Sequence, residues 1–272
     1  MGQAVQLGSR LSAMRGRLTA AAINGLADWT PYVESEIGGL RHLVNPGDVC
    51  IDVGAAAGLY TVALSRLSGP DGRVHSVEPL PFANFSVARL VSAWQATNVC
   101  RHVVALGARP GVGIMHVPLG RHGLVTGRSF LSGSAAGPDP NVEFASQVAV
   151  TVSIDTLDAL CVRERIDRLQ FIKIDVEGAE LQVMEGGKQV IADSRPVILV
   201  EVEARHTARY QRTPGEVMAW MFDRGYTMHT WQRGWHPAYS MDSSTRNYLF
   251  RPSPQGRRAP KRRREQPARV PA

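Results

Sequence analysis

The sequence contains no apolar run of about 18 residues, the length that a membrane-spanning helix requires. Cysteine is also scarce, because only Cys50, Cys100 and Cys161 are present and none of them forms a Cys-x-x-Cys pair. An odd number of widely separated cysteines excludes a disulfide framework and is typical of reduced thiols. The two absences together predict a cytoplasmic protein.

Net charge is missing from most of the chain, although the whole chain carries a formal charge of +7. Residues 251–272 hold eight Lys or Arg residues and one acid, so the preceding residues are neutral overall. We expect 251–272 to be a disordered basic tail. It would either be a solubilising segment or make weak contacts with nucleic acid or an anionic membrane through phosphate groups.

The length of 272 residues and the hydrophobic content of 44% predict one α/β domain over 45–250, preceded by a helical segment over 1–44. Leu7, Leu11, Met14 and Leu18 share one face of a predicted helix in that segment. Apolar strand patterns then alternate with helical ones, as in a doubly wound parallel sheet with helices on both faces. The predicted strands are 49–53, 73–78, 101–106, 112–117, 148–154, 169–174, 196–202, 226–230 and 248–250. The predicted helices are 58–67, 82–94, 180–191 and 214–222. We expect residues 120–141 to be a long surface loop that shapes the acceptor site.

The first strand ends in Asp52-Val53-Gly54-Ala55-Ala56-Ala57-Gly58. Glycines at such a turn let a ligand approach the backbone closely. Glu78 ends the next strand, 24 residues after Gly54, which is near the spacing at which an acid binds ribose hydroxyls. The turn therefore predicts a nucleoside pocket.

The turn has two glycines in the spacing Gly-x-x-x-Gly, whereas a dinucleotide site favours Gly-x-Gly-x-x-Gly. A carboxylate at Asp52 would repel a pyrophosphate and attract a cationic ligand. We therefore expect S-adenosylmethionine, with an unusual NAD site or a turn without a ligand as alternatives.

Asp175 follows another strand, and its position makes it a candidate catalytic base beside the transferred methyl group. His206 is a second candidate base, because its ordinary pKa suits proton transfer near neutral pH. Asp175, Glu201 and Glu203 could instead hold a divalent metal, an alternative to a site without metal. Glu180 could simply complement a helix dipole, and Glu177 and Glu203 could be surface residues paired with Lys173 or Arg205.

The chain resembles the FkbM-type methyltransferases over about residues 45–203. The resemblance rests on the turn at 52–61, on Val77-Glu78-Pro79 with Asn84-Phe85, on Ala105-Leu106-Gly107, on Thr156-Leu157-Asp158, and on Phe171-Ile172-Lys173-Ile174-Asp175-Val176-Glu177-Gly178-Ala179-Glu180. It departs from the family at Ala56, where Asn is usual.

The resemblance implies a class I, Rossmann-like methyltransferase fold with a mostly parallel seven-stranded sheet. It also implies methyl transfer from S-adenosylmethionine to a hydroxyl of a small molecule, sugar or glycan. The expected donor-binding residues are Asp52, Gly54, Ala55, Ala57, Gly58, Tyr60, Thr61, Glu78, Pro79, Asn84, Ala105 and Leu106, and Asp175 lies at the transfer site. The alternatives are a catalytically silent nucleotide-binding module, and an RNA or protein methyltransferase that uses the basic tail. Oligomeric state stays open.

Overall fold

A computed structural model describes residues 34–121, 123–132 and 146–253. The predicted N-terminal helix and residues 254–272 lie outside this part of the chain. The basic tail was predicted to begin at residue 251, but residues 251 and 252 belong to the last strand of the sheet. Among the described helices, none combines the length and the apolar composition needed to cross a bilayer.

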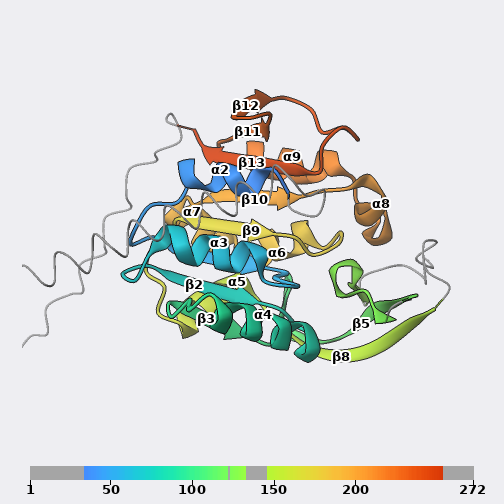
Figure 1. Ribbon diagram of the computed structural model, residues 1–272. Coiled ribbons are helices and arrows are strands. Elements are labelled where there is room, and N and C mark those ends of the chain that lie inside the picture. The colour runs from blue at the N-terminus through green and yellow to red at the C-terminus, as the bar shows by residue number, and fades with distance from the viewer. Residues whose placement is uncertain (1–33, 122, 133–145, 254–272) are drawn as a thin grey trace, which may run out of the picture.

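The central sheet has eight strands instead of the expected seven (Figure 1). Its parallel part runs in the order β3 (Val99–His102), β2 (Arg73–Val77), β1 (Val49–Val53), β9 (Phe171–Ile174) and β10 (Val197–Glu201). The antiparallel part continues with β13 (Asn247–Pro252), β11 (Tyr226–Trp231) and β12 (Trp235–Ala238). The class I order is thus confirmed.

The unexpected eighth strand is β12, which returns from β11 as a hairpin. Trp231 and Trp235 meet across this hairpin, edge to face, with ring centroids 5.1 Å apart. Both rings also cover Gly39 of α2 (Glu36–Gly39), where a Cβ would lie 2.7 Å from Trp231. The hairpin is therefore stabilised by aromatic packing. The sequence of β12, Trp-His-Pro-Ala, has no alternating apolar pattern from which the strand could have been predicted.

Helices cover both faces of the sheet (Figure 1). One face packs against α2, the 3-10 helix η1 (Leu40–His42) and α3 (Leu59–Ser68), beside which lies α4 (Pro81–Ala93). The other face packs against α5 (Leu157–Arg163), α6 (Glu180–Gly186), α7 (Lys188–Ser194) and α9 (Pro214–Phe222). Apolar side chains of the strands alternate between these two cores, which explains why the strands read as continuous apolar runs.

Two predicted elements are divided. The strand expected over 101–106 separates into β3 and β4 (Ala105–Leu106), and β4 pairs with β8 (Gln147–Asp155) in a second sheet. The helix expected over 180–191 breaks at Gly187, between α6 and α7. Close packing explains the break, because a Cβ at Gly186 would lie 2.1 Å from the Gly107 carbonyl oxygen.

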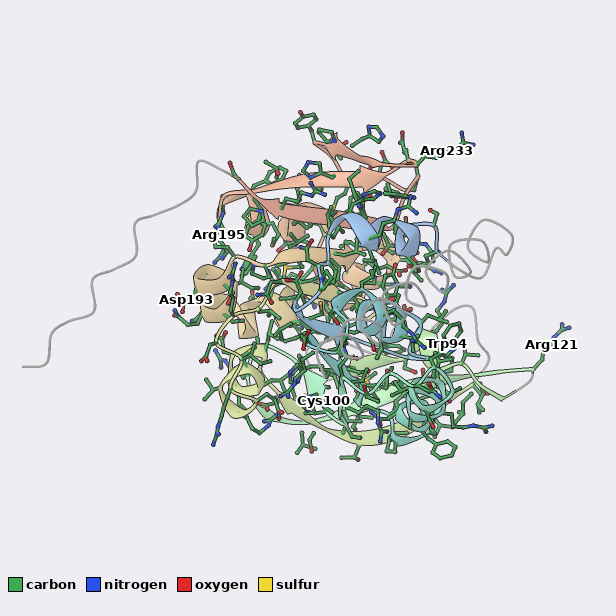
Figure 2. All side chains as sticks on the ribbon, turned by 60° about the vertical axis from the view of Figure 1, so that its left-hand side comes forward. Trp94, Cys100, Arg121, Asp193, Arg195 and Arg233 are labelled. Atoms are coloured by element: carbon green, nitrogen blue, oxygen red, sulfur yellow. The ribbon has the colours of Figure 1, made fainter. Side chains whose placement is uncertain are left out.

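The second sheet contains the segment that was expected to be a loop. It joins β4 and β8 to β5 (Gly111–Gly120), β6 (Gly123–Leu124) and β7 (Phe130–Ser132), with the 3-10 helix η2 (Thr126–Arg128) between the last two. Arg121, where β5 turns toward β6, projects far from the body of the protein (Figure 2). The loop prediction is therefore wrong for 123–132, and residues 133–141 lie outside the described residues.

The turn from β1 into α3 depends on Gly54. Its backbone has φ of +81°, and a Cβ at this position would lie 1.7 Å from the Asp175 carbonyl oxygen. The turn also uses Gly58, which precedes α3 in a left-handed conformation with φ of +87°. Gly54 thus lets the loop after β1 touch the loop after β9.

We predict that Gly54→Ala destabilises the protein far more than Gly47→Ala does. Both glycines have positive φ, but nothing lies within 4 Å of a Cβ at Gly47. The Gly47 variant should lose about 1 kcal/mol of unfolding free energy through backbone strain alone. The Gly54 variant should lose about 3 kcal/mol or more, because two backbone segments must separate. Urea denaturation measures both, and equal losses would contradict the packing argument.

Candidate functional site

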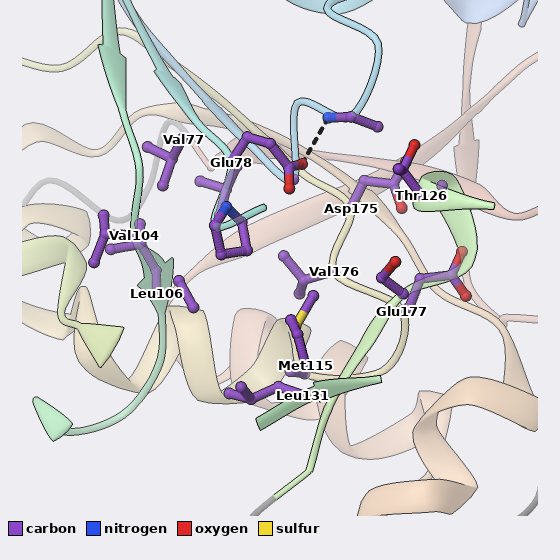
Figure 3. Close-up of a pocket in the computed structure, with 18 residues that line it drawn as sticks. Val77, Glu78, Val104, Leu106, Met115, Thr126, Leu131, Asp175, Val176 and Glu177 are labelled. Carbon is purple, nitrogen blue, oxygen red and sulfur yellow. Dashed lines mark hydrogen bonds between the residues drawn. The ribbon is translucent and has the colours of Figure 1, made fainter. Parts of the chain in front are cut away.

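A cavity of about 630 Å³, its open mouth included, lies at the carboxyl ends of β1, β2 and β9 (Figure 3). Residues of the second sheet and of η2 close its other side. The lining residues are Val53, Gly54, Ala56, Val77, Glu78, Pro79, Val104, Ala105, Leu106, Met115, Thr126, Gly127, Ser129, Leu131, Asp175, Val176, Glu177 and Ala179. Ligands of open parallel sheets bind at this edge.

Glu78 is fixed by backbone donors on both carboxylate oxygens. The Ala56 N–H donates to Oε2 over 2.9 Å (Figure 3), and the Leu80 N–H donates to Oε1 over 2.9 Å. The side chain is 5% exposed, and burial raises its pKa while the two backbone bonds lower it in part. An anchored carboxylate with free lone pairs is suited to accept two ligand hydroxyl groups.

Apolar side chains surround the part of the cavity beside Glu78. Val77 and Pro79 come from the end of β2, Val104 and Leu106 come from the segment after β3, and Met115 comes from β5. In Figure 3 these side chains stand around one region of the cavity, with Asp175 and Thr126 on its other side. A flat heteroaromatic group fits such an apolar slot.

Asp175 lies at the polar side of the cavity, where its side chain is 31% exposed. Its Oδ2 lies 3.8 Å from the Lys173 ammonium, and Glu201, at the end of β10, lies close enough to act on its pKa. Burial raises the pKa of Asp175, and Lys173 opposes this increase. A carboxylate with an elevated pKa at a cavity wall is a candidate proton acceptor.

Glu177 lines the cavity next to Asp175, and His206 lies behind it. The His206 Nδ1 atom is 3.0 Å from the Glu177 Oε2 atom, and the His206 side chain is 4% exposed. His206 belongs to α8 (Ala204–Thr207), which packs against Gly178 so closely that a Cβ there would lie 2.3 Å from the His206 carbonyl oxygen. His206 therefore contacts the cavity only through Glu177, and Glu177 is not the surface partner of Lys173 that was considered.

Asp52 does not line the cavity. Its carboxylate is buried in β1 and accepts a hydrogen bond of 2.6 Å from Thr61 of α3, whose hydroxyl also lies 2.9 Å from Ser76. Burial raises the pKa of Asp52 to about 6, although Thr61 lowers it. Asp52 thus ties β1 to α3 below the turn.

The structure brings Gly54, Glu78, Pro79, Ala105, Leu106 and Asp175 of the expected site residues to the cavity wall. The other expected positions lie around it. Ala55 and Gly58 form the turn itself through the bond from Gly58 N–H to the Ala55 carbonyl, and Ala57 belongs to the same turn. Asn84 accepts a hydrogen bond of 2.8 Å from Arg101, and Tyr60 lies over Lys173.

Sequence reasoning missed three groups of lining residues. One group lies at or just beyond the ends of the strands and comprises Val53, Val77, Val104, Val176, Glu177 and Ala179. Ala56 lines the cavity with φ of +43° and donates to Glu78, although it was noted only as a departure from the family pattern. Met115, Thr126, Gly127, Ser129 and Leu131 come from the second sheet and η2. The sequence indicated that residues 120–141 shape the site, but it did not indicate which residues of this segment line the cavity.

Two groups of side chains bear on metal binding. Glu203 bonds to Arg205 over 2.7 Å and to Arg246 over 3.3 Å, so its carboxylate is already paired. Among the described residues, the one group whose ligand-type atoms approach within 4.8 Å is His75, His102 and Glu164. The two rings lie at 16° to each other with facing nitrogens 3.0 Å apart, which is the geometry of one N–H···N hydrogen bond. Burial lowers the pKa of both imidazoles, and we assign them as a neutral pair.

The chain matches the family model described as the methyltransferase FkbM domain over residues 52–228. No curated protein matches the sequence at a significant level.

Solved structures similar to this chain include three methyltransferases. A methyltransferase FkbM from Methylobacillus flagellatus KT is 14% identical over 80% of this chain and 51% of that one, with a TM-score of 0.48. This chain therefore spans about half the length of that protein. The O-methyltransferase TomG from Streptomyces achromogenes is 13% identical over 88% and 89% of the two chains, with a TM-score of 0.46. A putative methyltransferase from Streptococcus mutans is 9% identical over 82% and 98%, with a TM-score of 0.45.

We predict that Glu180→Gln stabilises the protein increasingly as the pH rises from 4.5 to 8. Glu180 is 2% exposed, its Oε1 accepts from Gly178 N–H, and its Oε2 has no partner. Burial raises its pKa from the ordinary value of 4.5 to about 7 in the folded protein. The free energy of unfolding of the wild type therefore falls as the pH rises between these two values. The gain over wild type should approach about 3 kcal/mol at most near pH 8 and vanish near pH 4.

Thermal unfolding at several pH values measures this difference. Glu185→Gln, on the same helix, is the control and should show no such dependence. A difference in stability between Glu180→Gln and wild type that does not change with pH would contradict the raised pKa of Glu180.

Proposed function

Because the chain belongs to the FkbM methyltransferase family, we propose that it methylates a hydroxyl group of a sugar, a glycan or another natural product, with S-adenosylmethionine as the methyl donor. The observation that carries the proposal is the pairing of two carboxylates across one cavity. Glu78 is anchored by backbone amides on one side, and Asp175 lies on the other.

The lining residues fit the donor. Glu78 would hold the ribose hydroxyls, and the apolar slot of Val77, Pro79, Val104 and Leu106 would hold the adenine. Gly54 and Ala56 line the cavity, so the backbone of the turn is within reach of a ligand. S-adenosylmethionine supplies a methyl carbon attached to a positively charged sulfur, which the carboxylates of this cavity stabilise electrostatically.

Asp175 is the proposed general base. It would orient the acceptor hydroxyl through a hydrogen bond and take up its proton during transfer. Its raised pKa brings the carboxylate closer to the acidity range in which a base operates efficiently. Glu177, with His206 behind it, would orient the acceptor from the adjacent wall.

The charges of the cavity support a neutral or cationic acceptor. Three carboxylates, from Glu78, Asp175 and Glu177, line it, and no Lys, Arg or His residue is among the lining residues that the structure describes. A polyanion such as RNA would be repelled from such a wall. The hydroxyls of Thr126 and Ser129 add donors and acceptors for a polyhydroxylated molecule.

We predict that Glu78→Gln weakens binding of S-adenosylmethionine about 10- to 100-fold. Gln places an NH2 group against the Ala56 or Leu80 N–H, so one donor faces another and a charge-assisted bond to the ligand is lost. Isothermal titration calorimetry measures the affinity, with Glu185→Gln as the control. Wild-type protein that binds neither the donor nor its demethylated product would refute the proposed function.

We predict that Asp175→Asn lowers the rate of methyl transfer about 100- to 10,000-fold and changes donor affinity little, because it removes the proton acceptor but keeps the shape. The transfer is measured as formation of S-adenosylhomocysteine with a panel of sugar and natural-product acceptors. Asp193→Asn, at an exposed position of α7, should retain full activity. Donor binding without transfer to any acceptor in the wild type would favour a catalytically silent module.

A further inference from the structure

Lys173 is a charged side chain in the middle of the protein. It belongs to β9, which lies between β1 and β10 in the interior of the sheet, and its relative exposure is 0%. Lysine is rarely buried to this extent, because removing an ammonium group from water is costly unless it is paired. The position of Lys173 therefore requires a specific set of partners.

Three direct partners surround the ammonium group. Nζ donates a hydrogen bond of 3.0 Å to Asn247 Oδ1, lies 3.8 Å from Asp175 Oδ2, and lies 4.9 Å from the centre of the Tyr60 ring. These partners come from β13, from the loop after β9, and from α3. Lys173 thus joins the cavity wall to two elements that do not line the cavity.

Glu34 holds the partners of Lys173 in turn. Its Oε2 accepts a hydrogen bond of 2.5 Å from the Tyr60 hydroxyl and one of 3.2 Å from Asn247 Nδ2. Asn247 therefore uses its amide oxygen for Lys173 and its amide nitrogen for Glu34. We call Lys173, Glu34, Tyr60 and Asn247 the lysine cluster.

The carboxylates around the cluster give Lys173 its charge. Burial alone would lower the pKa of the ammonium, but the negative charges of Asp175, Glu34, Glu201 and Asp52 raise it above its ordinary value. Lys173 is therefore an ammonium ion at neutral pH.

Asp175 and Glu201 depend on this charge. Burial raises the pKa of both carboxyl groups. The charge of Asp175 raises the pKa of Glu201 further, whereas Glu201 lowers the pKa of Asp175. Lys173 lowers the pKa of both. The remaining charged groups that act on the pair are Glu34 and Glu177, which oppose the ionisation of Asp175, and Arg246, which favours that of Glu201.

We propose that Lys173 is the positioning residue of the transfer site: held by Glu34, Tyr60 and Asn247, its ammonium fixes the Asp175 carboxylate at the cavity wall and makes Asp175, rather than Glu201, the proton acceptor. This inference rests on the proposed function, because it names the residue that positions the proposed general base, Asp175.

The proton balance is simple. Asp175 begins as a carboxylate beside Lys173. The acceptor hydroxyl gives its proton to Asp175, which becomes neutral, and Lys173 remains an ammonium ion. Asp175 then loses this proton to solvent through the open mouth of the cavity, where its side chain is 31% exposed.

A spectroscopic experiment tests the proposal without an acceptor. The sequence contains only three lysines, Lys173, Lys188 and Lys261, so protein labelled with 15N-lysine gives a simple spectrum. We expect Lys173 Nζ to show the shift of an ammonium ion at pH 9, with protons that exchange more slowly than those of exposed Lys188. A neutral amine at Lys173 would overturn the proposal.

A titration experiment tests the effect on Asp175. In protein with 13C-labelled aspartate, we expect Lys173→Met to move the carboxyl titration of Asp175 upward by about one to three pH units, the range typical of losing an adjacent cation. Lys188→Met is the matched control and should leave this titration unchanged. A titration of Asp175 that is the same in Lys173→Met and wild type would overturn the proposal.

Two further variants address folding and charge. If Lys173→Met does not fold, Asn247→Ala replaces it, because this variant removes the oxygen that binds the ammonium but removes no charge. We expect Asn247→Ala to raise the titration of the Asp175 carboxyl by less than Lys173→Met would. Lys173→Arg retains the charge, so the acidic limb of the transfer-rate profile should stay near its wild-type pH, even if the maximal rate falls. With Lys173→Met that limb should move upward with the carboxyl titration.

Calorimetry separates the two proposals. Lys173→Met should bind S-adenosylmethionine within about threefold of the wild type, because Lys173 is not a lining residue. Absence of donor binding in the wild type would refute the proposed function, whatever Lys173 does. Normal donor binding with an acidic limb that does not move in Lys173→Met would refute only the role assigned to Lys173.

Discussion

The contact between Gly54 and the Asp175 carbonyl determines how the cavity is built. Strands β1 and β9 are neighbours in the sheet, and the loops that follow them would separate if a side chain lay between them. Because Gly54 has none, the chain turns at once and presents the Ala56 N–H to Glu78. The same contact places Asp175 across the cavity from Glu78. One missing Cβ therefore positions both carboxylates on which the proposed chemistry depends.

Charge is the second constraint, and it follows from the first. Bringing the ends of β1, β9 and β10 together also brings Asp52, Asp175 and Glu201 near Lys173. Like charges this close cannot all be ionised in a partly dry environment. The ammonium group of Lys173 offsets this negative charge. Because Lys173 is buried and does not line the cavity, the cavity wall itself remains negative. A wall of this sign fits a cationic donor and a neutral acceptor.

The sequence predicted the parts of this arrangement that local chemistry specifies. The apolar runs of β1, β2, β9 and β10 are buried on both faces, so they were recognisable without alternation, and Gly54, Glu78 and Asp175 follow them directly. Contacts between segments that are distant in the sequence could not be predicted in this way. β4 is separate from β3 because it pairs with β8, and Gly186, next to the break at Gly187, packs against Gly107 about 80 residues away in the chain. Thr126 and Ser129 carry no local signal, because they reach the cavity only through the pairing of β5 with β7 and β8.

Asp52 shows the limit of reasoning by motif. Its place just before the glycine turn predicts a ligand contact, but side chains alternate along β1, and that of Asp52 lies on the face of α3, where Thr61 binds it. The segment Lys173-Ile174-Asp175-Val176-Glu177-Gly178 departs from such alternation, because β9 ends at Ile174. Lys173 lies in the strand and faces the lysine cluster, Asp175 leaves the strand at the cavity, and Glu177 reaches His206 only because its own φ is +55° and Gly178 lets α8 approach. Three charged residues, each two positions apart, thus serve three environments. Such spacing in a strand that ends at a cavity is a stronger sign of a transfer site than any one of the residues, because each is costly to bury without the others.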